Sequence, residues 1–343
     1  MKAAVIKKIG QFGIENVPEP ECGPDRVKVK IKYCGLCGTD PEILEDRFGL
    51  MKGRPPRQGA SGPAIIGHEA CGNIVEVGKS CKMGYKIGQR VAMNFRSACG
   101  VCYYCRNKME HFCSHSIGAT GAYAEYAVYH EAAIYPLPDE ISFEKGVLLE
   151  PVSIAIHTMD QANITPGKSV MISGAGPIGL LAMEMAIKSG AASVLVSEPV
   201  EFKRALAKKL GADVTVNPVS QDVIKVGKEM TQGRGFDVVI EASGNLEAAR
   251  QSLYLADKGG SVIWAAVYAY DKEIPVNPFN MYANELTIKS VFIAPYSFPR
   301  ALNMLAKLNL EGIVTDVFPL DEIQEAFEKH KQGKSVKTLI KMY

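Results

Sequence analysis

The sequence predicts a two-domain α/β protein that combines a doubly wound parallel sheet with a β-rich domain. Three observations lead to this fold class. The chain has 343 residues, which exceeds a single typical domain. Residues 1 to about 150 carry short β-type runs broken by glycine and proline. From Val152 onward strands alternate with helices, which is typical of a parallel sheet with right-handed crossovers.

The β-rich part is indicated by runs of β-forming residues. They are RVKVKIKY at 26–33, GNIVEVG at 72–78, QRVAM at 89–93 and AEYAVYH at 124–130. The alternating part begins with a strand at 169–173, a glycine-rich turn and an apolar helix. It continues with SVLVSEP at 193–199, a helix at 201–212, VTVNP at 214–218, DVVIEASG at 237–244 and SVIWAAV at 261–267. The chain shows no internal repeat and no low-complexity tract.

Composition argues against several classes of function. A hydrophobic content of 47% and a charged content of 22% are ordinary for a soluble globular protein. The net charge of +2 gives no broad basic surface for nucleic acid or an anionic membrane. No apolar run approaches the ~20 residues that span a bilayer, and the N-terminal stretch becomes polar too early for a signal peptide. We therefore expect a cytoplasmic protein with no nucleic-acid or membrane partner.

Four of the nine cysteines fall in the stretch SACGVCYYCRNKMEHFC. In a reducing compartment, metal binding or plain burial is a better default for them than disulfide formation. The spacing Cys99-x2-Cys102-x2-Cys105-x7-Cys113 suits a tetrahedral zinc bound by four thiolates, and four unrelated buried thiols are the alternative. Because such a zinc has no open coordination position, we predict a structural site, and the chemistry must lie elsewhere.

A second set of ligand-type residues lies upstream. GLCGTD supplies Cys37, and GHE supplies His68 and Glu69. A thiolate, an imidazole and a carboxylate suit a zinc with a free coordination position. Cys34 and Cys37 also form a CxxC, so a redox pair is the competing interpretation, although no thioredoxin-like pattern accompanies it.

The glycine-rich turn GAGPIG follows a predicted strand and opens a predicted helix. In this context Gly174 permits the turn, Gly176 lets the backbone approach a pyrophosphate, and Gly179 lets the helix pack closely on the strand. Pro177 and Ile178 complete the turn, and the helix N-terminus attracts phosphate groups. The turn therefore predicts a dinucleotide-binding Rossmann domain.

An acidic residue follows at the end of the next predicted strand. Glu198 can bind the ribose 2′- and 3′-hydroxyls there, and its charge repels a 2′-phosphate, so we predict NAD rather than NADP. Lys203 and Arg204 on the following helix either contact the cofactor, which would temper that preference, or belong to a solvated helix face.

The order GLCGTD, GHE, CxxCxxCx7C, LEP and GxGxxG resembles that of the zinc-dependent medium-chain dehydrogenase/reductase family, which includes the alcohol dehydrogenases. The sorbitol (polyol), threonine and 2,3-butanediol dehydrogenases are the most similar group, and the resemblance covers essentially the whole chain. It implies a GroES-like catalytic domain of residues 1–151 and 290–343 that carries two zincs. It also implies a Rossmann NAD-binding domain of residues 152–289 and a homo-oligomer, either a dimer or a tetramer.

The resemblance also implies roles for individual residues. Cys37, His68 and Glu69 match the catalytic zinc ligands of the family. Glu150 in LLEPVSIAIHT matches a nearby acidic residue that binds the metal directly or through water. The four clustered cysteines match the structural zinc site, and Thr39 matches the hydroxyl residue that accepts the substrate's proton.

The chain departs from the family's pattern at several positions. Five residues after the zinc cysteine, many relatives have a histidine that relays the proton onward; Glu42 here either takes over that relay or faces solvent. Ile293 stands where many sorbitol-type relatives carry a pocket arginine. Arg47, Arg54 and Arg57 either recognise a phosphate or carboxylate group or form an exposed basic loop.

We therefore predict a zinc-dependent NAD oxidoreductase that oxidises a small secondary alcohol to a ketone by hydride transfer. Polyols, diols and amino-alcohols, with or without a phosphate group, are the candidate substrates. The alternative within enzymes is a reductase that acts mainly in the opposite direction on a ketone or aldehyde. A zinc-finger-type nucleic-acid module conflicts with the near-neutral charge. A non-catalytic nucleotide-binding protein would not need the complete ligand set of an open metal site.

Overall fold

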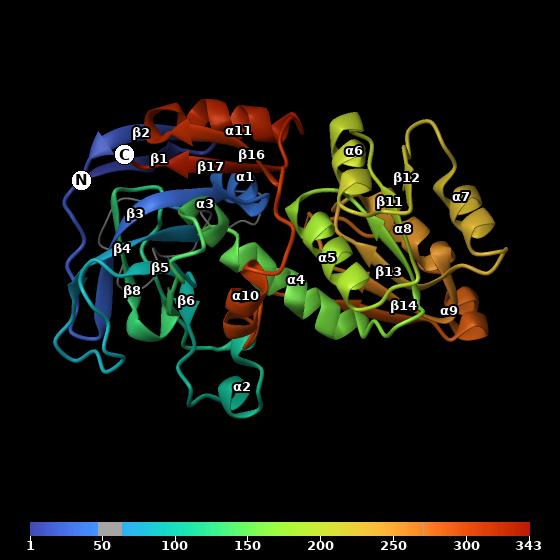
Figure 1. Ribbon diagram of the computed structural model, residues 1–343, viewed down its shortest axis with the longest axis horizontal. Helices are drawn as coiled ribbons and strands as arrows, with labels where there is room; N and C mark the ends of the chain where they lie inside the picture. The colour runs from blue at the N-terminus through green and yellow to red at the C-terminus, as the bar shows by residue number, and fades with distance from the viewer. Residues whose placement is uncertain (47–63, 270) are drawn as a thin grey trace. The chain divides into compact units, whose positions relative to one another are not determined.

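The computed structural model describes residues 1–46, 64–269 and 271–343 of the chain. These residues form two compact units (Figure 1). The first unit comprises Met1–Glu150, Phe298–Lys307 and Val314–Tyr343, and the second comprises Pro151–Ser297 and Leu308–Ile313. Each unit carries one of the two kinds of sheet that the sequence predicts.

The first unit is built on a seven-stranded sheet. Its order is β16-β17-β3-β4-β5-β9, with β8 paired to β3. The strands are β3 (Arg26–Leu36), β4 (Glu69–Val77), β5 (Arg90–Met93), β8 (Tyr126–His130), β9 (Ile134–Pro136), β16 (Val314–Pro319) and β17 (Lys337–Lys341). Strands β3, β4, β5 and β8 overlap the four predicted runs. The end of the chain adds β17, which pairs antiparallel with β3.

Shorter elements complete the first unit. Two-stranded ribbons join β1 (Lys2–Lys8) to β2 (Gln11–Asn16) and β6 (Arg96–Ser97) to β7 (Ile117–Gly118). The helices are α1 (Thr39–Leu44), α2 (Tyr103–Arg106), α3 (Phe143–Gly146), α10 (Phe298–Leu305) and α11 (Ile323–Lys331), and α4 (Leu149–Ala162) starts here and continues into the second unit. Alternate residues of β3, including Val27, Val29 and Ile31, are fully buried in a core that also holds Phe327 of α11. The period of two reflects the side-chain alternation of a strand.

The second unit contains a six-stranded parallel sheet in the order β12-β11-β10-β13-β14-β15. The strands are β10 (Ser169–Ser173), β11 (Ser193–Ser197), β12 (Val214–Val216), β13 (Phe236–Glu241), β14 (Ala256–Trp264) and β15 (Thr287–Ser290). The order reverses between β10 and β13, which is the topological switch point where ligands bind in open α/β sheets. The central strands are buried on both faces, as apolar runs such as VMIS and VVIE require.

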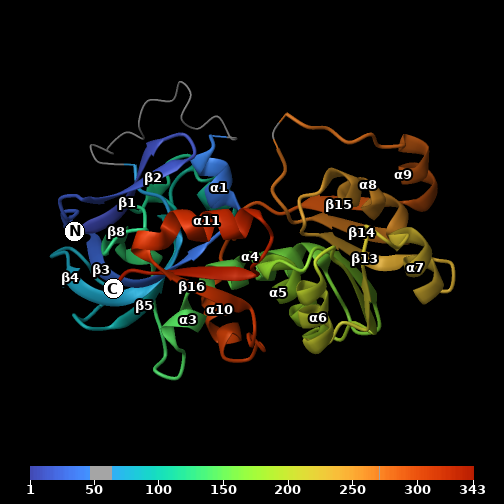
Figure 2. The ribbon, with the colours of Figure 1, turned by 90° about the horizontal axis from the view of Figure 1, so that it is seen from above.

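Helices cover both faces of the parallel sheet. Helices α5 (Pro177–Lys188) and α6 (Glu201–Lys209) lie on one face, and α7 (Val223–Met230) and α8 (Leu246–Leu255) lie on the other (Figure 2). Helix α9 (Pro278–Asn284) contacts β14. Within the described part of the chain, no helix combines the length and apolar character needed to cross a membrane.

The predicted fold class is confirmed: a doubly wound parallel sheet accompanies a β-rich unit. From the sequence we expect the chain to re-enter the β-rich domain near residue 290. In the structure it re-enters the first unit at Phe298. The chain up to Ser290 still forms β15 of the parallel sheet. Residues Leu308–Ile313 also belong to the second unit, where Asn309 N–H donates a hydrogen bond of 2.7 Å to Glu184 Oε1 on α5.

Candidate active site

The first candidate centre lies where β3 ends and β4 begins. Cys37 directly follows β3, while His68 precedes β4 and Glu69 is its first residue. The strands are antiparallel and Gly35 pairs with Glu69, so the end of one meets the start of the other. One ligand atom from each of Cys37, His68 and Glu69 consequently lies within 4.8 Å of the other two. The structure therefore brings together the three residues that the sequence indicated as ligands.

Gly35 makes room for the Glu69 carboxylate. A Cβ built at Gly35 would lie only 2.2 Å from Glu69 Oε2 and 2.8 Å from Val147 Cγ1. A side chain at this position would therefore displace the carboxylate from its buried place. This glycine serves the close approach of a side chain rather than a turn.

Asp40 supports His68, and the sequence analysis did not single it out. It is fully buried, and its Oδ1 lies 3.3 Å from His68 Nδ1. Its Oδ2 accepts hydrogen bonds from the Cys37 backbone N–H at 2.9 Å and from the Tyr123 hydroxyl at 2.6 Å. A carboxylate beside Nδ1 leaves Nε2 of the imidazole available to a metal. The available sequence signal was the acidic residue directly after Thr39 in GLCGTD.

Lys337 is the second functional candidate that sequence reasoning missed. It is 2% exposed and comes from β17, near the end of the chain. Its ammonium group donates hydrogen bonds to Glu69 Oε1 at 2.8 Å, to Glu69 Oε2 at 2.6 Å and to the Leu36 carbonyl at 3.0 Å. No local motif surrounds Lys337 in the sequence, so only the pairing of β17 with β3 reveals it.

The ionisable groups of this centre shift one another's pKa values. Burial raises the pKa of Glu150 to about 7, and the charge of Glu69 adds to the rise. Burial alone would lower the pKa of His68, yet the charge of Asp40 holds it well above its usual value. Burial would likewise lower the pKa of Lys337, but the charge of Glu69 raises it. The thiol, imidazole and carboxylate donors of Cys37, His68 and Glu69 are the ligand types that fit zinc at this place.

Other predicted residues of this region lie on α1, at the end of β3 or in the predicted basic loop. Thr39 begins α1 and Glu42 lies on the same helix, both half-buried, and their roles stay predictions. The arginines of the predicted basic loop lie outside the described residues. Cys34 is fully buried, and burial raises the pKa of its thiol well above the usual value. A thiol that stays protonated is a poor redox partner for Cys37.

The second candidate centre is the four-cysteine cluster between β6 and β7. Ligand atoms of all four cysteines lie within 4.8 Å of one another. Three Sγ–Sγ distances are 3.5 Å (Cys102–Cys105), 3.9 Å (Cys102–Cys113) and 4.0 Å (Cys99–Cys105). A tetrahedral zinc with Zn–S bonds of ~2.3 Å places its sulfurs ~3.8 Å apart, so the cluster has the size of a four-thiolate zinc site. Backbone N–H groups of Cys105 and Ser114 lower the pKa of Cys102 to about 6, which favours its thiolate form.

The glycine-rich turn connects β10 to α5 at the carboxyl end of the parallel sheet. Gly174 has a φ of 95°, and a Cβ there would lie 3.0 Å from the Ser243 backbone. A Cβ at Gly179 would lie 2.0 Å from the Gly174 carbonyl, so α5 packs this closely only with glycine. Gly176 caps α5, Pro177 is its first residue and Ile178 follows. A Cβ at Gly176 would have no described atom within 4 Å, so the turn is open there.

Glu198 is tied to this turn. It follows β11, is 6% exposed, and its Oε2 accepts a hydrogen bond of 2.8 Å from the backbone N–H of Ala175. Its Oε1 accepts a bond of 3.0 Å from the Val200 N–H. Lys203 is half-buried on α6; burial lowers its pKa, and the charge of Glu198 opposes that change. Arg204 donates to the backbone carbonyls of Glu198 and Pro199, so it does not simply face solvent.

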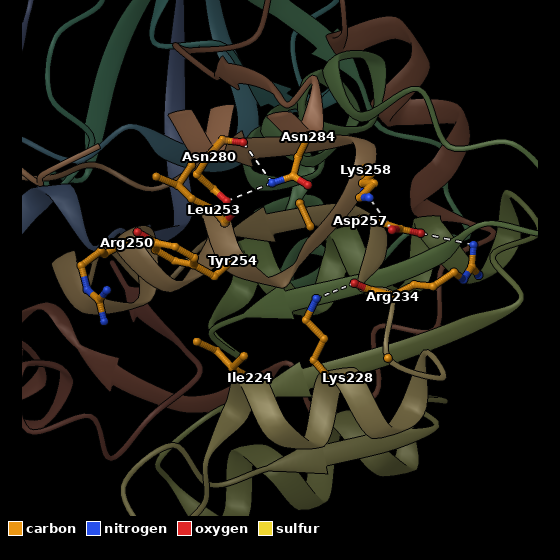
Figure 3. Close-up of a pocket in the computed structure, with 12 residues that line it drawn as sticks. Ile224, Lys228, Arg234, Arg250, Leu253, Tyr254, Asp257, Lys258, Asn280 and Asn284 are labelled. Atoms are coloured by element: carbon orange, nitrogen blue, oxygen red, sulfur yellow. Dashed lines mark hydrogen bonds and ion pairs between the residues drawn. The ribbon is translucent and has the colours of Figure 1, made fainter. Parts of the chain in front are cut away.

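A separate pocket lies elsewhere in the second unit (Figure 3). It measures about 750 Å³, and Lys228 of α7, Tyr254 of α8 and Asn280 of α9 are among the residues that line it. Ala256, also part of its lining, is the first residue of β14. The pocket therefore lies towards the amino ends of the parallel strands, opposite the glycine-rich turn, and shares no residue with either candidate metal centre.

Two family models match the chain. The alcohol dehydrogenase GroES-like domain matches residues 23–139, which include the Cys37 centre and the cysteine cluster. The zinc-binding dehydrogenase model matches residues 177–307, which begin within the glycine-rich turn.

Characterised relatives extend over nearly the whole chain. The L-threonine 3-dehydrogenase of Pyrococcus furiosus is 35% identical over 98% of this chain and 97% of its own. The D-arabitol-phosphate dehydrogenase of Enterococcus avium is 33% identical over 96% of this chain and 94% of its own. Among solved structures, a zinc-binding dehydrogenase from Sinorhizobium meliloti bound to NADP superposes with a TM-score of 0.90 at 30% identity, covering 99% of both chains.

Proposed function

The chain belongs to the family of zinc-binding dehydrogenases that carry an alcohol dehydrogenase GroES-like domain, and on this premise we propose that it oxidises a secondary alcohol to a ketone with NAD. The carbinol carbon gives a hydride to the nicotinamide and the hydroxyl gives up a proton, so the products are the ketone, NADH and a proton. The observation that carries the proposal is the convergence of one ligand atom each from Cys37, His68 and Glu69 within 4.8 Å of one another.

We assign the catalytic zinc to these three residues, with Glu150 binding it directly or through water. When bound, zinc supplies Lewis acidity towards the substrate hydroxyl. Oγ1 of Thr39 accepts the hydroxyl proton and passes it on, either through the Glu42 carboxylate or directly to water. The four-cysteine cluster holds the structural zinc, which leaves no position for substrate.

NAD is assigned to the second unit. The N-terminus of α5 and the open backbone at Gly176 receive the pyrophosphate. The Glu198 carboxylate, held by Ala175 and Val200, retains lone pairs for the ribose hydroxyls. The same charge repels a 2′-phosphate, so we propose NAD over NADP even though one related structure holds NADP. Lys203 lies beside Glu198 and is proposed as a cofactor contact.

The relatives suggest the substrate class. Their names identify an amino-alcohol and a phosphorylated polyol as substrates of two similar enzymes. Ile293, at the position of the arginine of many sorbitol-type relatives, removes a charge from the substrate pocket that we propose there. It adopts a φ of 56°, a strained conformation for a β-branched residue, and such strain often marks functional segments.

We also propose that the protein is a homo-oligomer in the cytoplasm. Helix α9 exposes Phe279 by 72% and Tyr282 by 81%, and β15 lies at one edge of the parallel sheet. Exposed aromatic side chains and sheet edges are each features of protein interfaces. Light scattering on the purified protein would distinguish a dimer or tetramer from a monomer.

A substrate screen tests the function directly. Reduction of NAD by the zinc-loaded protein is measured against polyols, diols, amino-alcohols and their phosphates, with the matching ketones and NADH run in reverse. Cys37→Ser serves as the inactive control and Cys22→Ser, a half-buried cysteine outside both centres, as the active control. Turnover of at least one secondary alcohol that depends on Cys37 supports the proposal. Equal activity of Cys37→Ser would overturn it.

A further inference from the structure

Lys337 occupies an unusual place for a cation. It contacts Glu69, one of the three groups that would hold a divalent metal, and its side chain is only 2% exposed. Burying an ammonium group is costly unless each of its donors finds a partner. Here all three donors are satisfied, two by the Glu69 oxygens and one by the Leu36 carbonyl. The ammonium is therefore held in one position.

The Glu69 carboxylate is also held in one position. It lies over Gly35, where a Cβ would be 2.2 Å from Oε2, and both of its oxygens face Lys337. A zinc bound with Cys37 and His68 requires an oxygen from the same carboxylate. One carboxylate thus serves two cations, and the cations repel each other.

We propose that Lys337 is a positioning residue of the metal centre that competes with the catalytic zinc for the Glu69 carboxylate. This inference rests on the proposed assignment of zinc to Cys37, His68 and Glu69. Lys337 stabilises the metal-free centre by neutralising Glu69, and it weakens the hold of Glu69 on the metal. Lys337 would keep the buried Glu69 carboxylate paired whether or not zinc is bound.

Competition and a purely structural role predict opposite changes in zinc binding when Lys337 is removed. If Lys337 only kept the site in shape, its removal would loosen the zinc. If it competes for Glu69, its removal tightens the zinc, because the buried carboxylate loses the cation that shares it with the metal. The metal-free protein becomes less stable at the same time, since the buried Glu69 carboxylate then loses its ion pair.

The rate at which zinc passes from the protein to a coloured chelator shows whether the loss of Lys337 tightens or loosens zinc binding. In Lys337→Met the catalytic zinc should leave the zinc-loaded protein about tenfold more slowly than in wild type, the usual scale for groups that contact metal ligands. Zinc in the four-cysteine cluster of the same molecules provides the internal control, and its release should not change. Lys337→Arg keeps the charge and should release zinc at nearly the wild-type rate. Faster or unchanged release from Lys337→Met would overturn the inference.

Two further measurements test the same inference with other variants. Lys337→Gln keeps a donor without the charge and should slow release to a smaller extent, which provides a test if Lys337→Met does not fold. In the Glu69→Gln background, Lys337→Met should change zinc release much less than it does in wild type, because the contested carboxylate is gone. A full tenfold effect there would show that Lys337 acts by another route and would reject the competition.

The failure of this inference is separable from that of the proposed function. If the wild-type protein binds zinc only at the cysteine cluster, the assignment of the catalytic zinc is wrong. If it binds zinc at both centres but Lys337→Met releases it no more slowly, only the competition is wrong.

Discussion

Asp40 Oδ1 lies 3.3 Å from His68 Nδ1, and this contact leaves the other ring nitrogen, Nε2, available to a metal. Asp40 is itself held by the Cys37 backbone N–H and by Tyr123, so the residue that orients one ligand is anchored beside another. The cluster is therefore prepared before any metal binds, which lowers the cost of ordering the ligands.

Asp40→Asn tests this support. The amide retains the size of the carboxylate but loses its charge, so His68 should bind the catalytic zinc about 10- to 100-fold more weakly. Zinc retained after dialysis against a chelator measures the effect. Asp139→Asn, which changes an exposed carboxylate of the same unit, is the matched control. Wild-type zinc retention by Asp40→Asn would show that the contact does not orient His68.

The two metal centres should respond differently to loss of one cysteine. Metal analysis should find two zincs per chain in wild type and one in both Cys37→Ser and Cys102→Ser. A closed four-thiolate site contributes folding free energy. Cys102→Ser should therefore lower the melting temperature by more than about 5 °C, the shift expected for a loss of about 2 kcal/mol in a domain of this size. Cys37→Ser should abolish turnover with a smaller loss of stability. A Cys102→Ser variant as stable as wild type would contradict the structural role.

Cofactor preference should depend on Glu198. Glu198→Ala removes the acceptor of the Ala175 N–H and the proposed ribose ligand, so kcat/KM with NAD should fall about tenfold or more. Use of NADP should fall less or improve, because the repulsion of the 2′-phosphate is gone. Glu229→Ala removes an exposed carboxylate of the same unit and should leave both values unchanged. Equal kcat/KM for the two cofactors in wild type would refute the predicted preference.

Stability at low pH should depend on Asp237. Its carboxylate accepts hydrogen bonds from Ser169 N–H at 2.8 Å and from Ser169 Oγ at 2.7 Å, which ties the start of β13 to β10. Burial would raise the pKa of Asp237, but the bonds from Ser169 and the nearby charges of Arg234 and Lys168 lower it. A lowered pKa means that the stabilisation is present above the unfolded-state value of ~3.9 and is lost as the pH falls through the folded-state value.

Asp237→Ala should therefore lower the free energy of unfolding by about 1 kcal/mol at neutral pH, a modest figure because the group is partly exposed and screened. The difference from wild type should shrink below pH ~4, where the wild-type carboxylate takes up its proton. Denaturant titrations at several pH values measure this difference in the free energy of unfolding. Asp271→Ala, which changes an exposed carboxylate, is the control. A difference that stays constant down to pH ~2 would show that the charge contributes nothing.

The amino-acid sequence alone determined the parts of this protein that depend on local spacing. The x2 intervals between cysteines fix where neighbouring sulfurs can meet. The glycines of the turn are required because α5 follows β10 within a few residues. Alternation of strands and helices determined the parallel sheet, because short crossovers permit little else. These features could be predicted because each relates residues that are close along the chain.

The tertiary structure alone decided what supports the metal centre. Lys337 and Glu69 are 268 residues apart, and they meet only because β17 pairs with β3 beside β4. Asp40 could be noticed in GLCGTD, yet its orientation towards His68 depends on bonds from Tyr123 across the core of the first unit. An ion pair between distant strands has no local signature, because it is set by strand order and register. Sequence reasoning therefore predicted the residues to which we assign the catalytic zinc, and only the fold revealed that Lys337 contacts one of them.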